Sequence, residues 1–146
     1  MDRPHVVVLV DHDPREPAVL DAVRSRAAQG PARFSLVVTN PRPNEAHLRH
    51  PLHPERHDGV QEVATQLDVW TAAIADAAGD EVLGDASIRH DPYDALEEQT
   101  LIRRVDEVIV SVERHAVAAL LHLDLVHRLT QQGLTVIDVR AGATPR

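Results

Sequence analysis

The feature that most constrains the fold is a continuous apolar run near the start of the chain, HVVVLV at residues 5–10. A strand with one face in water alternates apolar and polar residues, whereas an unbroken β-branched run is typical of a strand buried on both faces. About six apolar residues are too few for a membrane span or a signal peptide. The run therefore predicts the central strand of a parallel sheet that helices cover on both sides.

Strand and helix patterns alternate along the rest of the chain. Further strands are expected at residues 34–39, 82–88, 107–111 and 134–139, with apolar residues at helical spacing between them. The helices are expected to begin near Asp13, Gly59, Asp91 and Asp124, three of which are good N-cap residues. Asp13 also forms a capping-box pattern with Glu16 and precedes a proline suited to the first helical turn.

This alternation predicts a single α/β domain over residues 1–146. The expected architecture has three layers, α/β/α, with a five-stranded parallel sheet in the order 3-2-1-4-5 and two helices on each face. Apolar residues make up 43% of the chain, which is enough to build the buried core that such a fold requires.

The charge balance argues against two classes of partner. The chain has 15 basic and 23 acidic residues and a net charge of −8, whereas nucleic-acid binding and docking on an anionic membrane need a basic surface. It has no cysteine, so disulfides and thiolate chemistry are excluded. Because no targeting segment is recognisable, a cytoplasmic location is expected.

Three local sequences resemble those of the universal stress protein family. They are VVVLVDHD at residues 6–13, RHDPYDAL at 89–96 and DEVIVS at 106–111, and their order and spacing extend the resemblance over nearly the whole chain. The resemblance implies the Rossmann-like fold that this family shares with the adenine nucleotide alpha hydrolases, and a role in the stress response. It also implies a crevice where the first and fourth strands end, in which Asp11 matches the aspartate that contacts adenine.

The family's ATP signature, G-x2-G-x9-G-[ST], is not preserved. Placed on this chain, it falls on Ser111, Arg114, Asp124 and Leu125, so the glycines and the final hydroxyl are lost. Glycine lets backbone N–H groups approach phosphates closely. Arg114 could still attract an anion, but Asp124 would repel one. The sequence therefore predicts a non-enzymatic regulatory or interaction protein with an unidentified protein partner and no resident cofactor. The alternative is an adenine-nucleotide-binding stress protein with an altered cradle of Asp11 and Arg114.

The candidate binding residues all belong to this crevice: Asp11, Asp13, Ser111, Arg114 and Asp124. Asp11, His12 and Asp13 follow the first strand, and they either form a cluster that faces a ligand or consist of a helix N-cap with two solvated neighbours. Ser111 lies near Glu113 and His115, which raises the possibility of a hydrolytic triad. No G-x-S-x-G elbow surrounds the serine, so the sequence favours a turn over a catalytic site.

Four histidines, His47, His50, His53 and His57, lie in a proline-rich segment between the second strand and the second helix. Neutral imidazole binds zinc, nickel or copper, so this segment is a candidate metal site. Prolines interrupt the spacing and no helix holds two of the histidines on one face. A polar loop with weak metal affinity is the competing interpretation.

The fifth strand predicts a homodimer. Its apolar segment starts at Leu134 and ends at Val139, and in the family that the chain resembles this strand lies at the sheet edge and pairs with its twin. An apolar edge strand needs to be covered, and a second copy of the chain would cover it.

Overall fold

The computed structural model describes residues 3–39, 58–89, 91–112 and 119–139, and it confirms the predicted alternation of strands and helices. The strands are β1 (His5–Val10), β2 (Arg33–Val38), β3 (Val82–Ala86), β4 (Glu107–Ser111) and β5 (Thr135–Asp138). The helices are α1 (Pro17–Ala28), α2 (Asp58–Ala78), α3 (Pro92–Ile102) and α4 (Ala119–Gln131).

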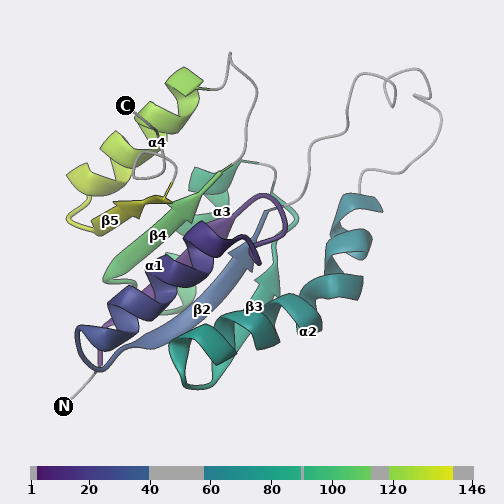
Figure 1. The fold of residues 1–146 in the computed structure, drawn as a ribbon. Coiled ribbons are helices and arrows are strands. Elements are labelled where there is room, and N and C mark those ends of the chain that lie inside the picture. The colour runs from purple at the N-terminus through teal and green to yellow at the C-terminus, as the bar shows by residue number, and fades with distance from the viewer. Residues whose placement is uncertain (1–2, 40–57, 90, 113–118, 140–146) are drawn as a thin grey trace.

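The strands form one parallel sheet in the predicted order, β3-β2-β1-β4-β5 (Figure 1). β1 is central, and all six of its residues are buried, as its unbroken apolar run predicts. In the register between β1 and β4, Val10 lies opposite Ser111, so the two central strands end side by side.

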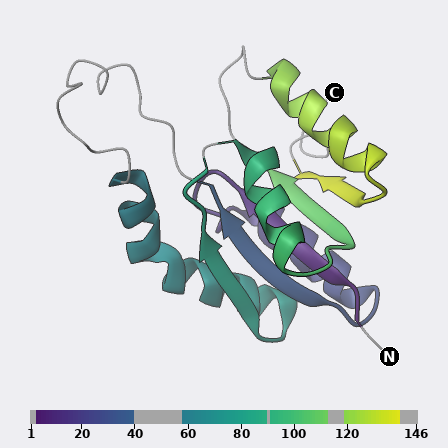
Figure 2. The same ribbon diagram turned by 180° about the vertical axis from the view of Figure 1, so that it is seen from behind.

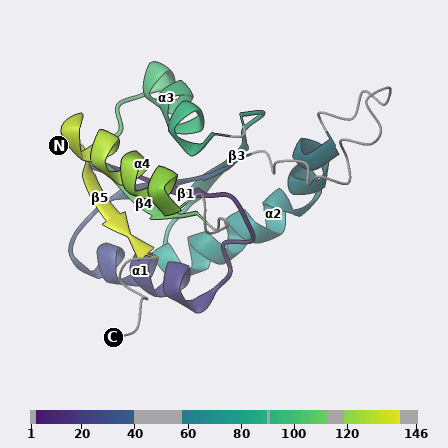
Figure 3. The same cartoon turned by 90° about the horizontal axis from the view of Figure 1, so that it is seen from above.

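Helices cover both faces of the sheet, two on each, as predicted (Figures 2 and 3). The face under α1 and α2 holds one buried cluster, which includes Val19, Val23, Trp70 and Ile74 from these helices. The face under α3 and α4 holds a second cluster, which includes Ala95, Leu96, Leu125 and Leu129. Alternate residues of β1 contribute to each cluster because successive side chains of a strand point to opposite faces.

Helix α2 packs very closely on the edge strand β3 at Gly84. A Cβ atom at this position would lie 2.1 Å from Thr71 Oγ1. No side chain fits in that space, so glycine at this position allows the helix to cover the inner face of the strand. Val82 and Ala86, which share this face, are packed in the core beneath α2.

The predicted start of the first helix is wrong. α1 begins at Pro17, and Glu16 is its N-cap residue, so the capping box from Asp13 to Glu16 does not form. The Asp13 carboxylate instead accepts hydrogen bonds from the backbone N–H and the guanidinium of Arg15. A local Asp–Arg turn therefore replaces the first helical turn that the sequence suggested.

The other two N-cap predictions have opposite outcomes. Asp91 caps α3 as expected, since its carboxylate accepts a hydrogen bond of 2.8 Å from the backbone N–H of Tyr93. Asp124 is not an N-cap, because α4 begins at Ala119 and residue 124 lies inside it. The apolar residues from 119 onward continue the helical pattern and extend the helix towards the N-terminus.

Strand β5 forms one edge of the sheet and is shorter than predicted. Its apolar side chains are not fully exposed, because Val136 packs against the core under α4 and Ile137 against the core on the opposite face. Within the described residues no strand pairs with the outer side of β5, and Thr135 on this strand is exposed. In the part of the chain that the structure describes, no helix is long and apolar enough to span a membrane.

Candidate functional site

The candidate site lies where β1 and β4 end next to each other. From this point the chain leaves β1 towards β2 on one side and β4 towards β5 on the other. In an open α/β sheet, ligands usually bind in the crevice at such a point, where the connections from the carboxyl ends of two neighbouring parallel strands run in opposite directions. Asp11 and His12 follow β1, Ser111 ends β4, and Glu16 stands at the start of α1.

These four residues form one hydrogen-bonded network. His12 Nδ1 lies 2.9 Å from Asp11 Oδ1, and His12 Nε2 lies 3.2 Å from Glu16 Oε1. The Ser111 hydroxyl donates a hydrogen bond of 2.8 Å to the same Glu16 oxygen. The Glu16 carboxylate therefore connects the end of β4 to the turn that follows β1.

The network favours a protonated imidazole at His12. Burial alone would lower the pKa of His12, but the hydrogen bonds to Asp11 and Glu16 outweigh it and raise the pKa above its usual value. A carboxylate oxygen can only accept a hydrogen bond, so both ring nitrogens need a proton to bond with both carboxylates. The imidazolium is thus the form that fits this position.

Glu16 is the residue of this site that the sequence did not identify. Its backbone caps α1 in an extended conformation, with φ −66° and ψ 146°, but its side chain makes no cap hydrogen bond. The carboxylate turns back towards Ser111 and His12 instead. Its position four residues after His12, in the turn that leads from β1 into the helix, is the signal that could have placed it in the crevice.

Ser111 does not have the environment of a catalytic nucleophile. It is completely buried, with a relative exposure of 0%. Its hydroxyl donates to a carboxylate, whereas the serine of a hydrolytic triad bonds to a histidine base. Glu113 and His115, the other members of the triad considered, lie outside the described residues.

Of the remaining predicted site residues, only Asp13 has a described side chain, and it does not join the network. Asp13 is bonded to Arg15, and that hydrogen bond lowers the pKa of its carboxyl group. Arg114 lies outside the described residues, and Asp124 lies within α4. Leu125, which occupies the hydroxyl position of the ATP signature, is buried in the core under α4.

The four histidines of the candidate metal site also lie outside the described residues: His47, His50, His53 and His57. Among the residues that are described, no group of three or more histidine and carboxylate side chains is arranged to hold a metal ion. The metal hypothesis for the 47–57 segment therefore stays a prediction.

Comparison with models of known protein families gives no match, and comparison with curated proteins gives no significant match either. The resemblance to universal stress proteins therefore depends on the local sequences quoted above. The fold agrees with the three-layer architecture that the resemblance implies, but an architecture of this kind serves many functions.

Proposed function

We propose that the chain is a non-enzymatic regulatory or interaction protein, similar to the universal stress proteins, that works as a homodimer and without ATP. The observation that supports this proposal best is the position of the Glu16 carboxylate. It bonds to Ser111 at the end of β4, in the crevice where a nucleotide-binding sheet of this type would receive phosphates.

A carboxylate at this position opposes phosphate binding in two ways. Its negative charge repels phosphate oxygens in a partly buried site where water screens poorly, and the His12 imidazolium, 3.2 Å from the same carboxylate, offsets only part of that charge because Asp11 shares it. Its side chain also accepts the hydrogen bond of the Ser111 hydroxyl, which would otherwise be available as a donor to a ligand at the end of the strand. A site for a nucleotide triphosphate needs donors at this point, and among the described residues the Ser111 hydroxyl is already bonded to an anion.

The same contacts support a non-enzymatic function. A nucleophile has to reach the substrate and needs a base that accepts its proton. Ser111 is buried, and His12, the histidine of the network, contacts Asp11 and Glu16 rather than the serine. The network therefore resembles a structural connection between β1, β4 and α1 more than a catalytic one.

The homodimer is proposed to form through β5, the edge strand that no other described strand covers on its outer side. Because Val136 and Ile137 pack against the cores of their own chain, lysine at these positions would disturb the monomer itself. Thr135 is a better position for a test, since its side chain is exposed on this strand. Leu83 on the opposite edge strand, β3, is 54% exposed and provides a matched control.

The experiment is native mass spectrometry of the purified chain, combined with equilibrium dialysis against labelled ATP. We expect a dimer that carries no nucleotide and shows no saturable ATP binding at micromolar concentrations. Thr135→Lys should give a monomer, whereas Leu83→Lys should leave the dimer intact. Glu16→Gln removes the negative charge but keeps an oxygen that can accept from Ser111, so any gain of ATP binding should appear in this variant.

Several outcomes would contradict the proposal. Stoichiometric, tight ATP binding by the unmodified chain would favour the alternative, a nucleotide-binding protein that uses Asp11 and Arg114. A monomeric chain would remove the homodimer, and a monomer produced by Leu83→Lys alone would place the interface at β3. ATP hydrolysis that is lost in Ser111→Ala would overturn the non-enzymatic function.

A further inference from the structure

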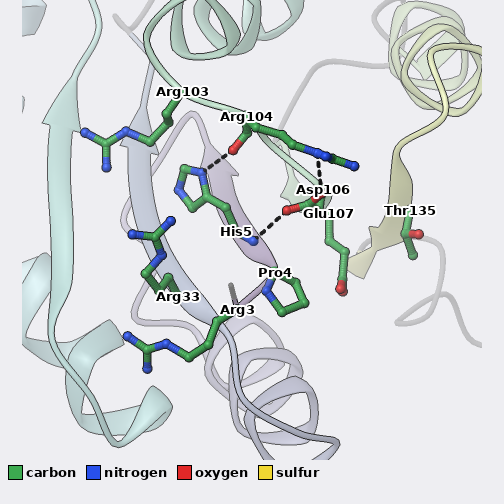
Figure 4. Close-up of a pocket in the computed structure, with 9 residues that line it drawn as sticks. All are labelled: Arg3, Pro4, His5, Arg33, Arg103, Arg104, Asp106, Glu107 and Thr135. Atoms are coloured by element: carbon green, nitrogen blue, oxygen red, sulfur yellow. Dashed lines mark hydrogen bonds and ion pairs between the residues drawn. The ribbon is translucent and has the colours of Figure 1, made fainter. Parts of the chain in front are cut away.

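A second region suited to a ligand lies at the amino ends of the strands, opposite the Glu16 network. Here the structure has a pocket of about 420 Å³ (Figure 4). The starts of β1, β2, β4 and β5 contribute to it, together with the connection between α3 and β4. Its lining residues are Arg3, Pro4, His5, Arg33, Arg103, Arg104, Asp106, Glu107 and Thr135.

Four of these lining residues are arginines, in a chain whose net charge is −8. Two of them already have carboxylate partners, since Arg3 pairs with Asp80 at 2.8 Å and Arg104 with Asp106 at 3.0 Å. The other acidic lining residue, Glu107, has a partner from outside the pocket. It accepts two hydrogen bonds from Arg26, of 2.7 and 2.9 Å.

The other two arginines that line the pocket are Arg33 and Arg103. Within the described residues neither has a carboxylate partner, and both side chains are exposed at the pocket. Figure 4 shows both on the same side of the His5 ring. The pocket therefore combines two available guanidiniums with carboxylates that are already neutralised.

His5 forms one wall of this pocket, and both of its ring nitrogens are hydrogen bonded. Its Nδ1 lies 2.9 Å from the carbonyl oxygen of Arg104 and its Nε2 lies 2.7 Å from the Ser35 hydroxyl. A carbonyl only accepts, so the Nδ1 carries the proton and Nε2 accepts from the serine. Burial lowers the pKa of His5 and outweighs the hydrogen bond to the Arg104 carbonyl, which raises it. The nearby guanidiniums of Arg103 and Arg33 lower the pKa further, so the imidazole is neutral.

The connection that carries Arg103 is firmly held. Asp106 accepts a hydrogen bond of 2.9 Å from the His5 backbone N–H, and its own N–H donates to the His5 carbonyl at 3.0 Å. Val105, between the two pocket arginines and Asp106, is buried in the core under α3 and α4. Arg33 starts β2, and its backbone N–H donates to the Pro4 carbonyl at 2.8 Å. Both available guanidiniums therefore extend from fixed backbone.

We propose that this pocket binds a small phosphorylated compound, whose phosphate group lies between the guanidiniums of Arg33 and Arg103. Arginine presents a planar fork of N–H donors that matches phosphate oxygens, and it is weakly hydrated compared with lysine. The volume of the pocket falls within the range of small-molecule sites, about 300–1,000 Å³. An anion would also relieve the repulsion between two like charges that face the same neutral histidine.

Isothermal titration with inorganic pyrophosphate tests the proposal, with inorganic phosphate and citrate as comparison ligands at constant ionic strength. We expect saturable binding of one pyrophosphate per chain. Binding should weaken at least tenfold in the double variant Arg33→Gln/Arg103→Gln, as about 1.4 kcal/mol of lost binding free energy would produce. The control Arg24→Gln/Arg89→Gln removes the same charge from exposed arginines outside the pocket and should bind as the unmodified chain does.

A second pair of measurements separates the site from general charge effects and from unfolding. Arg33→Lys/Arg103→Lys keeps both charges and should still weaken binding, because a lysine lacks the fork. In NMR titrations, pyrophosphate should raise the pKa of His5 in the unmodified chain and leave that of His12 unchanged. The absence of saturable binding, an equal loss in the control variant, or binding of citrate in preference to both phosphates would overturn the proposal.

Discussion

In the part of the chain that the structure describes, each end of the sheet has a histidine with both ring nitrogens hydrogen bonded, and the two imidazoles favour opposite charge states. At the carboxyl end, His12 lies between the carboxylates of Asp11 and Glu16, which raise its pKa against the effect of burial. At the amino end, His5 lies between a carbonyl and a serine hydroxyl, and burial lowers its pKa. The partners of a histidine, and not its burial alone, decide its charge.

The difference extends to what each end can bind. Open parallel sheets receive their ligands at the carboxyl end, where anionic groups meet backbone donors. In this chain a carboxylate occupies that point, whereas available guanidiniums gather at the amino end. Among the described residues, the carboxyl end therefore presents a carboxylate and the amino end available guanidiniums, and both proposals depend on this contrast.

The largest effect is expected from the ion pair between Arg26 on α1 and Glu107 on β4, next to the amino-end pocket. Its side chains are only 9% and 17% exposed. Arg26→Met should lower the free energy of unfolding by about 2 kcal/mol, because it leaves the Glu107 carboxylate partly buried without its partner. Urea unfolding at neutral pH measures the change.

Two further variants sharpen that result. Arg26→Met/Glu107→Leu removes both charges and should recover most of the lost stability. Arg15→Met breaks the exposed pair with Asp13 at the carboxyl end and should have no measurable effect, because water screens exposed pairs. Equal losses from Arg26→Met and Arg15→Met would mean that the partly buried pair Arg26–Glu107 stabilises the fold no more than the exposed pair Arg15–Asp13 does.

An intermediate effect is expected from two buried serines, one at each end. Ser35→Ala leaves the His5 Nε2 buried without a donor and should cost about 1–2 kcal/mol. Ser111→Ala should cost about 1 kcal/mol or less, because Glu16 is 30% exposed and keeps its contact with His12. Thermal or urea unfolding compares them, and a larger loss at Ser111 would show that its hydrogen bond to Glu16 stabilises the fold more than the bond between Ser35 and His5 does.

The smallest effect is the pH dependence of stability, which should have opposite signs for the two histidines. His12 has a raised pKa in the folded chain, so its contribution is present at low pH and is lost as pH rises above 6.5. His5 has a lowered pKa, so its contribution is present above 6.5 and is lost as pH falls below that value. In plots of unfolding free energy against pH, His12→Gln should lose the decrease above pH 6.5, and His5→Gln should lose the decrease below pH 6.5.

Matching slopes in these two variants would contradict the assignment of opposite charge states. Direct NMR titration of the two ring signals gives an independent measurement, since His12 should titrate above its usual pH range and His5 below it. Glu16→Gln should lower the pKa of His12 and leave that of His5 unchanged, because the carboxylate contacts only the first of them.

The fold was predictable because its signals are local and repeated. The unbroken apolar run at residues 5–10 indicated a strand buried on both faces, and the alternation with helices indicated the parallel order. The N-cap at Asp91 was also predictable from two adjacent residues. At Asp13 the same kind of signal failed, since a local contact with Arg15 competed with the capping box.

The two sites were predictable only in part. Asp11 and Ser111 follow from the ends of strands, which periodicity reveals. The direction of the Glu16 side chain depends on a hydroxyl 95 positions away along the chain, which no local pattern indicates. The amino-end pocket brings together Arg3, Arg33 and Arg103 from three separate segments, and none of them carries a motif.

The glycine beneath α2 has a consequence for how the sheet is assembled. Gly84 pairs with Leu36 in the register between β3 and β2. A slip of one residue would turn Leu83 or Asp85 towards the helix, because strand side chains alternate between faces. At the contact with Thr71 there is no space even for a Cβ atom. In a register shifted by one residue, the side chain of Leu83 or Asp85 would have to occupy this space, so the close contact of α2 with β3 favours the native register over its nearest alternatives.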